Sequence, residues 1–188
     1  RSKRDGEDVV WQRVTQGLPA VVTRPCTVYG PGCTDGAGKA FSRPTSITAI
    51  PGSGKQLLAN VRAEDVAAAL EHLSPLEDAV GQAYNIVDES RPTLEQALRL
   101  AAEAFGTKPP SLHLPVPAVK AVAWVNGTLS ALRGKVPDLE VDAVNYLYDD
   151  YAVDNTKLKE TGFECKYPDF EESIRQLGEA YSSTKELG

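Results

Sequence analysis

The sequence contains no methionine, and cysteine, histidine and aromatic residues are scarce. Its three cysteines, Cys26, Cys33 and Cys165, are odd in number and include no Cys-x-x-Cys pair. This spacing argues against a disulfide framework and against a zinc site, so we expect no metal and a reducing, cytoplasmic location. The chain opens on Arg1 without an initiator methionine. We therefore expect that a preceding segment is absent.

The chain also lacks an excess of positive charge and a long apolar run. Its formal net charge is -6 and its isoelectric point is about 5.0. Nucleic acid is excluded as a partner, because such a chain gains little from releasing counterions. The apolar run 116–125 is interrupted by Lys120 and is shorter than the roughly 20 residues of a membrane span. We expect no membrane crossing.

The composition that remains, 41% hydrophobic and 24% charged, is typical of a folded domain. Acidic residues ahead of Val9, Val10 and Val14 predict a helix over 5–16. The apolar segment 18–23, after a glycine stop, predicts a buried strand. A helix, a tight turn and a buried strand form half of a βαβ unit. The pattern therefore indicates an α/β fold with a parallel sheet.

Glycine and proline are dense over 24–43, which predicts a surface loop after that strand. Loops at the carboxyl ends of strands are where α/β sheets bind ligands. The other predicted elements are strands over 46–50, 56–61 and 82–87, an extended piece over 112–116, a segment over 141–148, and helices over 63–73, 94–105, 119–132, 155–160 and 170–181.

Two runs of residues near the amino terminus resemble a known protein family. They are Ser2-Lys3-Arg4-Asp5-Gly6-Glu7 and Arg24-Pro25-Cys26-Thr27-Val28-Tyr29-Gly30-Pro31-Gly32. In the extended short-chain dehydrogenase/reductase superfamily, a Tyr-x-x-Ser-Lys-x-x-x-Glu helix precedes a strand ending in Arg-Pro-x-x-Val-Tyr-Gly-Pro-Gly. This superfamily includes NAD-dependent epimerases and dehydratases and three-beta-hydroxysteroid dehydrogenases. The resemblance covers nearly the whole chain and is loosest over 112–150.

The resemblance implies the C-terminal part of a Rossmann-type doubly wound parallel sheet, with a small α/β substrate-binding region. Residues 1–30 would end the Rossmann core, and residues 31–188 would form the substrate-binding region and return elements to the core. It further implies an oxidoreductase with NAD or NADP as cofactor. Most cofactor contacts would come from an N-terminal half missing here, so the fragment alone would be inactive. Family members commonly dimerise through the helix that matches 3–16, which implies a possible homodimer.

Three positions match functional residues of the family. Lys3 matches the catalytic lysine, which binds the nicotinamide ribose and lowers the pKa of a tyrosine four residues earlier. That tyrosine would lie before Arg1. Pro25 and Val28 match positions that line the nicotinamide pocket, although a strand end and a loop explain them equally well. The predicted cofactor-binding residues are therefore Lys3, Pro25 and Val28, and Lys3 is also the predicted catalytic residue.

Other reactive residue types have simpler explanations. Cys26 would lie beside the pocket but has no recognisable base, so we expect a small buried residue rather than a nucleophile. His72 and His113 are expected to be structural or surface groups. Glu64 and Asp65 begin a predicted helix, where capping and the helix dipole explain them.

One departure from the family bears on the substrate. Nucleotide-sugar enzymes of the family usually carry an arginine at the position of Leu58, which clamps a diphosphate. Leucine cannot bind phosphate, which favours a small apolar alcohol or ketone, such as a sterol-like molecule, as substrate. Lys55 is expected to be solvated. The alternatives are a nucleotide-sugar epimerase or dehydratase, and a non-catalytic NAD(P)-binding regulatory module.

Overall fold

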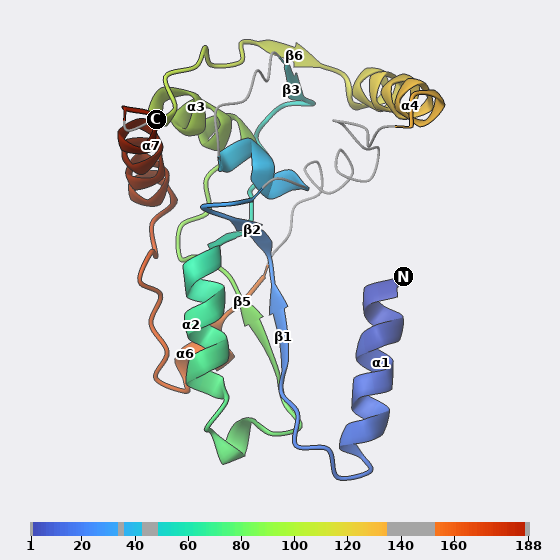
Figure 1. The fold of residues 1–188 in the computed structure, drawn as a ribbon, viewed down its shortest axis with the longest axis vertical. Helices are drawn as coiled ribbons and strands as arrows, with labels where there is room; N and C mark the ends of the chain where they lie inside the picture. Colours follow the sequence, from blue (N-terminus) through green and yellow to red (C-terminus); the bar gives the residue numbers. More distant parts are fainter. Residues whose placement is uncertain (1, 34–35, 43–48, 135–152, 187–188) are drawn as a thin grey trace.

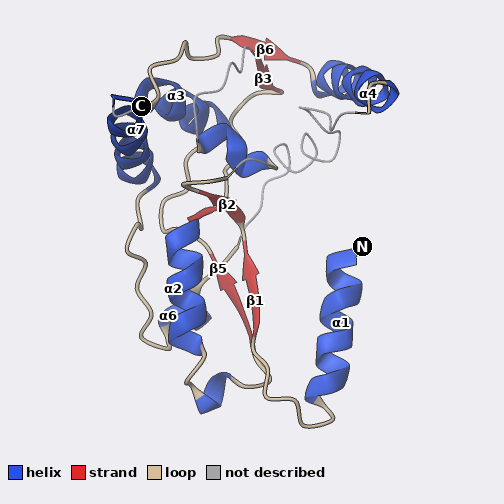
Figure 2. Cartoon of the chain, viewed as in Figure 1, coloured by secondary structure: helices blue, strands red, loops and turns tan. Residues whose placement is uncertain are grey.

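The computed structural model of the chain describes residues 2–33, 36–42, 49–134 and 153–186 (Figure 1). It is an α/β fold in which short parallel strands lie between helices (Figure 2). The segment predicted over 141–148 lies outside the described residues, and so does most of the strand predicted over 46–50.

The first helix and strand form an antiparallel pair of elements. Helix α1 (Ser2–Val14) runs down and strand β1 (Val22–Pro25) runs back up beside it (Figure 1). Gly17 makes the reversal at a φ of 96°, in the left-handed region that glycine reaches without steric cost. The predicted helix is confirmed, but Val9 is 55% exposed and does not share the inner face with Val10 and Val14.

The described residues form three two-stranded sheets, and all three are parallel. Strand β1 pairs with β5 (Ala83–Ile86), and β2 (Thr27–Tyr29) pairs with β4 (Asn60–Arg62). Strand β3 (Ala49–Pro51) pairs with β6 (Leu112–Leu114). The predicted parallel pairing and α/β class are confirmed. Strands of segment 31–188 pair with strands of segment 1–30, so part of the longer segment returns to the sheet of the shorter one. The division of the chain into a Rossmann-core region and a substrate-binding region stays a prediction.

The prediction of a surface loop over 24–43 is wrong for two parts of this segment. This segment contains strand β2 and the short 3-10 helix η1 (Ala37–Phe41). Tyr29 and Phe41 are fully buried. Both rings pack against Phe170, with centroid distances of 5.2 and 5.6 Å. A three-residue strand flanked by glycine and proline leaves too short a pattern to recognise, and the burial depends on partners far along the chain.

Two helices agree with their predicted bounds. Helix α2 (Ala63–Leu73) is confirmed residue for residue, and α3 (Leu94–Ala104) begins after Thr93. Thr93 forms a capping box with Gln96, in which each side chain accepts a hydrogen bond from the other residue's backbone N–H. Such a box satisfies two amides that a helix start leaves free. The remaining helices are η2 (Glu77–Ala79), α4 (Val116–Leu132), α6 (Thr156–Lys159) and α7 (Phe170–Glu186).

The core consists of two main clusters. One lies where η1, α3 and α7 meet, and the other joins α2, β4 and β5 to the α6 region. Leu158 and Phe163 belong to the second cluster, so the segment around α6 packs against β5, the strand that pairs with β1. Among the described residues, no helix combines the length and the apolar character that a membrane crossing requires.

Candidate functional site

Two of the three predicted site residues, Lys3 and Pro25, come from α1 and β1. Since α1 and β1 run in opposite directions, the amino end of α1 and the carboxyl end of β1 lie at the same level (Figure 2). Lys3 stands in the first turn of α1 and is exposed, and Pro25 ends β1 and is exposed too. The fold therefore brings Lys3 and Pro25 to the end of the strands where α/β proteins bind ligands.

Val28 is placed differently. It lies in the middle of β2, is half-buried and packs against the core cluster of α2, β4 and β5. Its carbonyl oxygen accepts a hydrogen bond from the thiol of Cys33. A Cβ on Gly38 would lie only 1.8 Å from the same carbonyl oxygen. The backbone of η1 thus lies directly against β2. A nicotinamide contact by Val28 stays a prediction.

An ion pair joins the two elements of the site. The guanidinium of Arg24 in β1 donates to both carboxylate oxygens of Glu7 in α1, with 3.1 Å from Nε to Oε2. Trp11 Nε1 donates to Glu7 Oε1 at 3.0 Å. The Arg24 hydrogen bond is the main reason that the pKa of Glu7 lies below its usual value, and it raises the pKa of Arg24.

A buried polar group that the sequence did not reveal lies behind β2. Tyr29 Oη donates to Asp88 Oδ2 at 3.0 Å, and both residues are almost completely buried. Burial raises the pKa of Asp88 to about 8, and it also raises the pKa of Tyr29. Asp88 Oδ1 and both side-chain polar atoms of buried Asn60 have no hydrogen-bond partner in the part of the chain that the structure describes. Asp88 follows an ordinary strand, so only the tertiary structure shows that its carboxyl is buried.

The explanation of Glu64 and Asp65 by helix capping is wrong. Asp65 is fully buried, and its two oxygens accept the backbone amides of Lys166 and Tyr167 at 2.7 and 3.0 Å. Glu64 pairs with Arg62 at 2.9 Å. Asp65 thus ties the start of α2 to a segment about 100 residues away, a partner that helix position cannot indicate.

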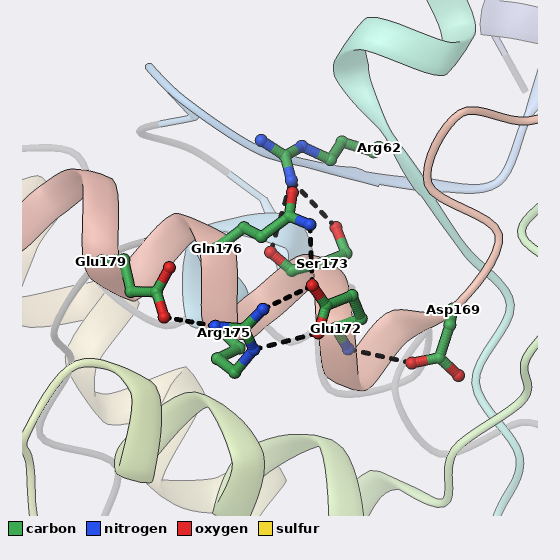
Figure 3. Close-up of polar contacts among 7 residues, drawn as sticks. All are labelled: Arg62, Asp169, Glu172, Ser173, Arg175, Gln176 and Glu179. Carbon is green, nitrogen blue, oxygen red and sulfur yellow. Dashed lines mark hydrogen bonds and ion pairs between the residues drawn. The ribbon is translucent and has the colours of Figure 1, made fainter.

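Arg62, next to the start of α2, also contacts the C-terminal part of the chain. Its guanidinium lies 3.8 Å from the centroid of the Tyr167 ring and donates to the backbone and hydroxyl oxygens of Ser173 in α7. Figure 3 shows Arg62 reaching α7 beside a chain of ion pairs on the same helix, in which Arg175 bridges Glu172 and Glu179. These contacts are structural and fix α7 to the strands.

His72 and His113 are structural and surface groups as predicted, whereas Cys26 is half-buried rather than fully buried. Burial raises the pKa of Cys26 to about 11, so its thiol is a poor nucleophile near neutral pH. His72 Nε2 lies 2.9 Å from Thr161 Oγ1, which joins α2 to the turn after α6. His113 lies 3.5 Å from Glu95 at the surface. No cluster of three potential metal ligands is found among residues 2–33, 36–42, 49–134 and 153–186.

Leu58 does not line an open site in the described structure. It is 5% exposed and belongs to the core cluster with Tyr29 and Phe170, whereas Leu57 is 44% exposed. A hollow of about 500 Å³ lies elsewhere, between α3 and the start of α7, and Lys3 is not part of its lining. Its lining includes Arg91, Gln96, Arg99, Glu103, Asp169 and Phe170.

Comparisons with known proteins agree at the level of fold. No protein-family model matches the chain, and no curated protein matches its sequence. Among solved structures, an epimerase from Methanothermobacter thermautotrophicus is similar with a TM-score of 0.67 and 15% identity, covering 97% of this chain and 49% of that one. The human epimerase family protein SDR39U1 with NADPH has a TM-score of 0.63 and 21% identity, covering 85% and 48%.

A third similar structure is dTDP-glucose 4,6-dehydratase from Bacillus anthracis in complex with NAD. Its TM-score is 0.63 and its identity 16%, covering 96% of this chain and 50% of that one. The chain shares the fold of the corresponding part of these epimerase and dehydratase structures. It spans about half the length of each of these proteins. The resemblance expected from Lys3 and the Arg24-Pro25 run is confirmed as a partial Rossmann-like fold.

Proposed function

We propose that this chain forms the C-terminal half of an NAD(P)-dependent oxidoreductase of the extended short-chain dehydrogenase type. The observation that carries the proposal is that the amino end of α1, with exposed Lys3, and the exposed carboxyl end of β1 lie at the same level (Figure 2), and that the ion pair of Glu7 and Arg24 joins the two elements. Likeness to structures that contain NADPH or NAD supports the same cofactor class. The phosphate-binding loop and the tyrosine would belong to a segment outside these 188 residues.

The residues of this chain fit one part of such a cofactor. The ammonium of Lys3 is exposed and carries three donors, which suit the hydroxyls of the nicotinamide ribose. The same positive charge would lower the pKa of a nearby phenol and let it exchange a proton near neutral pH. Pro25 and Val28 would lie beside the carboxamide. The bound cofactor would supply the hydride.

For the substrate, we propose a small apolar alcohol or ketone, such as a sterol-like molecule. A diphosphate clamp needs an arginine, and the corresponding position holds Leu58, which is packed in the core. A second candidate is a nucleotide sugar. It is favoured by likeness to UDP-glucose 4-epimerase with UDP-glucose from Thermotoga maritima, at a TM-score of 0.58 and 22% identity.

Cofactor titration of the intact gene product tests the proposal. NADH or NADPH fluorescence should change on binding, and Lys3→Met should weaken binding by about tenfold, the effect of losing one charged hydrogen bond. Arg4→Met removes a neighbouring exposed charge from another face of α1 and should leave the affinity unchanged.

Two results would contradict the proposal. If the intact product binds neither NADH nor NADPH, the dehydrogenase assignment fails. If the intact product binds cofactor but has no tyrosine four residues ahead of Lys3, a non-catalytic regulatory module becomes the better description.

A further inference from the structure

Helix α1 is held to the rest of the chain by one face. None of its side chains is fully buried, and its half-buried residues are Glu7, Val10, Trp11 and Val14. At 3.6 residues per turn these four positions and Lys3 lie along the same stripe. Little buried apolar surface is therefore available to stop α1 from sliding along β1.

Glu7 supplies the specific contact on this stripe. Its carboxylate accepts hydrogen bonds from Arg24 across the gap between the elements and from Trp11 one turn further along α1. Its side chain is 23% exposed, less than the 53% of Arg24. A two-point guanidinium–carboxylate contact has a fixed geometry, so it restricts sliding and rotation of the helix as well as adding energy.

The same contact sets the position of Lys3. Lys3 lies one turn, about 6 Å, beyond Glu7 toward the amino end of α1. Pro25 and Cys26 lie one and two residues, about 3 Å each, beyond Arg24 toward the carboxyl end of β1. Both displacements point to the same end of the molecule (Figure 1). The register of Glu7 with Arg24 therefore determines how Lys3 faces the strand end.

We propose that Glu7 is a positioning residue. By accepting hydrogen bonds from Arg24 and Trp11, it fixes the position of α1 along β1 and so places Lys3 relative to Pro25. The inference deepens the proposed function and rests on it. Glu7 itself touches no cofactor and acts through Lys3.

A double-mutant cycle on the intact gene product, with NADPH as probe, tests this role. Glu7→Gln should weaken NADPH binding by about tenfold and raise hydrogen exchange in Ser2–Val14, while exchange in α2 stays unchanged. In a Lys3→Met background, Glu7→Gln should cause no further loss of affinity, because its effect passes through Lys3. Asp8→Asn, an exposed carboxylate at the next position, is the matched control and should change neither quantity.

The possible outcomes separate the two proposals. Faster exchange in α1 with unchanged NADPH affinity would show that Glu7 only stabilises the helix, and additive losses in the cycle would show that it does not act through Lys3. Either result overturns the positioning role and leaves the proposed function intact. If the unmodified protein binds neither NADPH nor NADH, the proposed function itself fails, and the positioning role fails with it.

Discussion

Asp88→Asn should make the protein more stable above neutral pH. The pKa of Asp88 in the folded chain is about 8, because its carboxyl is buried, whereas its usual value is 3.8. A difference of this size corresponds to a gain on the order of 3–5 kcal/mol near pH 8. Asparagine resembles the protonated acid and can still accept the hydrogen bond of Tyr29.

The direction with pH follows from where the proton is bound. Between about pH 4 and pH 8 the unfolded chain has lost the Asp88 proton and the folded chain keeps it. Unfolding then releases a proton, so the contribution of Asp88 to stability is fully present below pH 4 and declines until about pH 8. Asparagine cannot ionise, and the decline should disappear in the variant.

Chemical denaturation at pH 4, 6 and 8.5 measures this effect. The two proteins should differ by no more than about 1 kcal/mol at pH 4, the size of one hydrogen bond, and should diverge as the pH rises. Asp78→Asn removes the same charge from an exposed position and is the control. Parallel pH profiles for Asp88→Asn and the unmodified protein would show that the folded carboxyl ionises normally.

Gly178→Ala should destabilise the protein by about 2–3 kcal/mol, although the same change in an ordinary helix is favourable. Gly178 lies in α7 where this helix crosses the end of α3. A Cβ at Gly178 would lie 2.2 Å from the carbonyl oxygen of Ala104 and 3.0 Å from its side chain. Since the obstacle is backbone, the two helices must separate and lose core contacts.

Gly127→Ala in α4 provides the matched comparison. No described residue lies within 4 Å of its Cβ position, so only helix propensity applies and the variant should gain about 0.5–1 kcal/mol. Thermal melting should therefore lower the midpoint for Gly178→Ala by about 5–10 °C and leave it unchanged or slightly raised for Gly127→Ala. A normal midpoint for Gly178→Ala would mean that α3 and α7 are not in backbone contact.

Local patterns were enough to predict several parts of the molecule. Helices α2 and α3 have the predicted bounds because helical periodicity, and for α3 the capping residue Thr93, lie within the same short segments. The run from Arg24 to Gly32, together with Lys3, indicated the fold class and the end of the sheet at which the candidate site lies. Parallel pairing followed from the apolar, valine-rich segment 18–23, although the strand itself, β1, starts only at Val22 and is half-buried to exposed rather than buried as predicted.

Contacts between distant segments decided the rest. Sequence spacing could not show that Asp65 binds amides at 166 and 167, that Asp88 retains its proton beneath Tyr29, or that β2 is buried under Phe170. Burial and pKa depend on which atoms displace water from a group, and those atoms come from other parts of the chain. The sequence by itself determined the helices and the family resemblance. The tertiary structure decided which carboxylates are buried and how Glu7 joins α1 to β1 through Arg24.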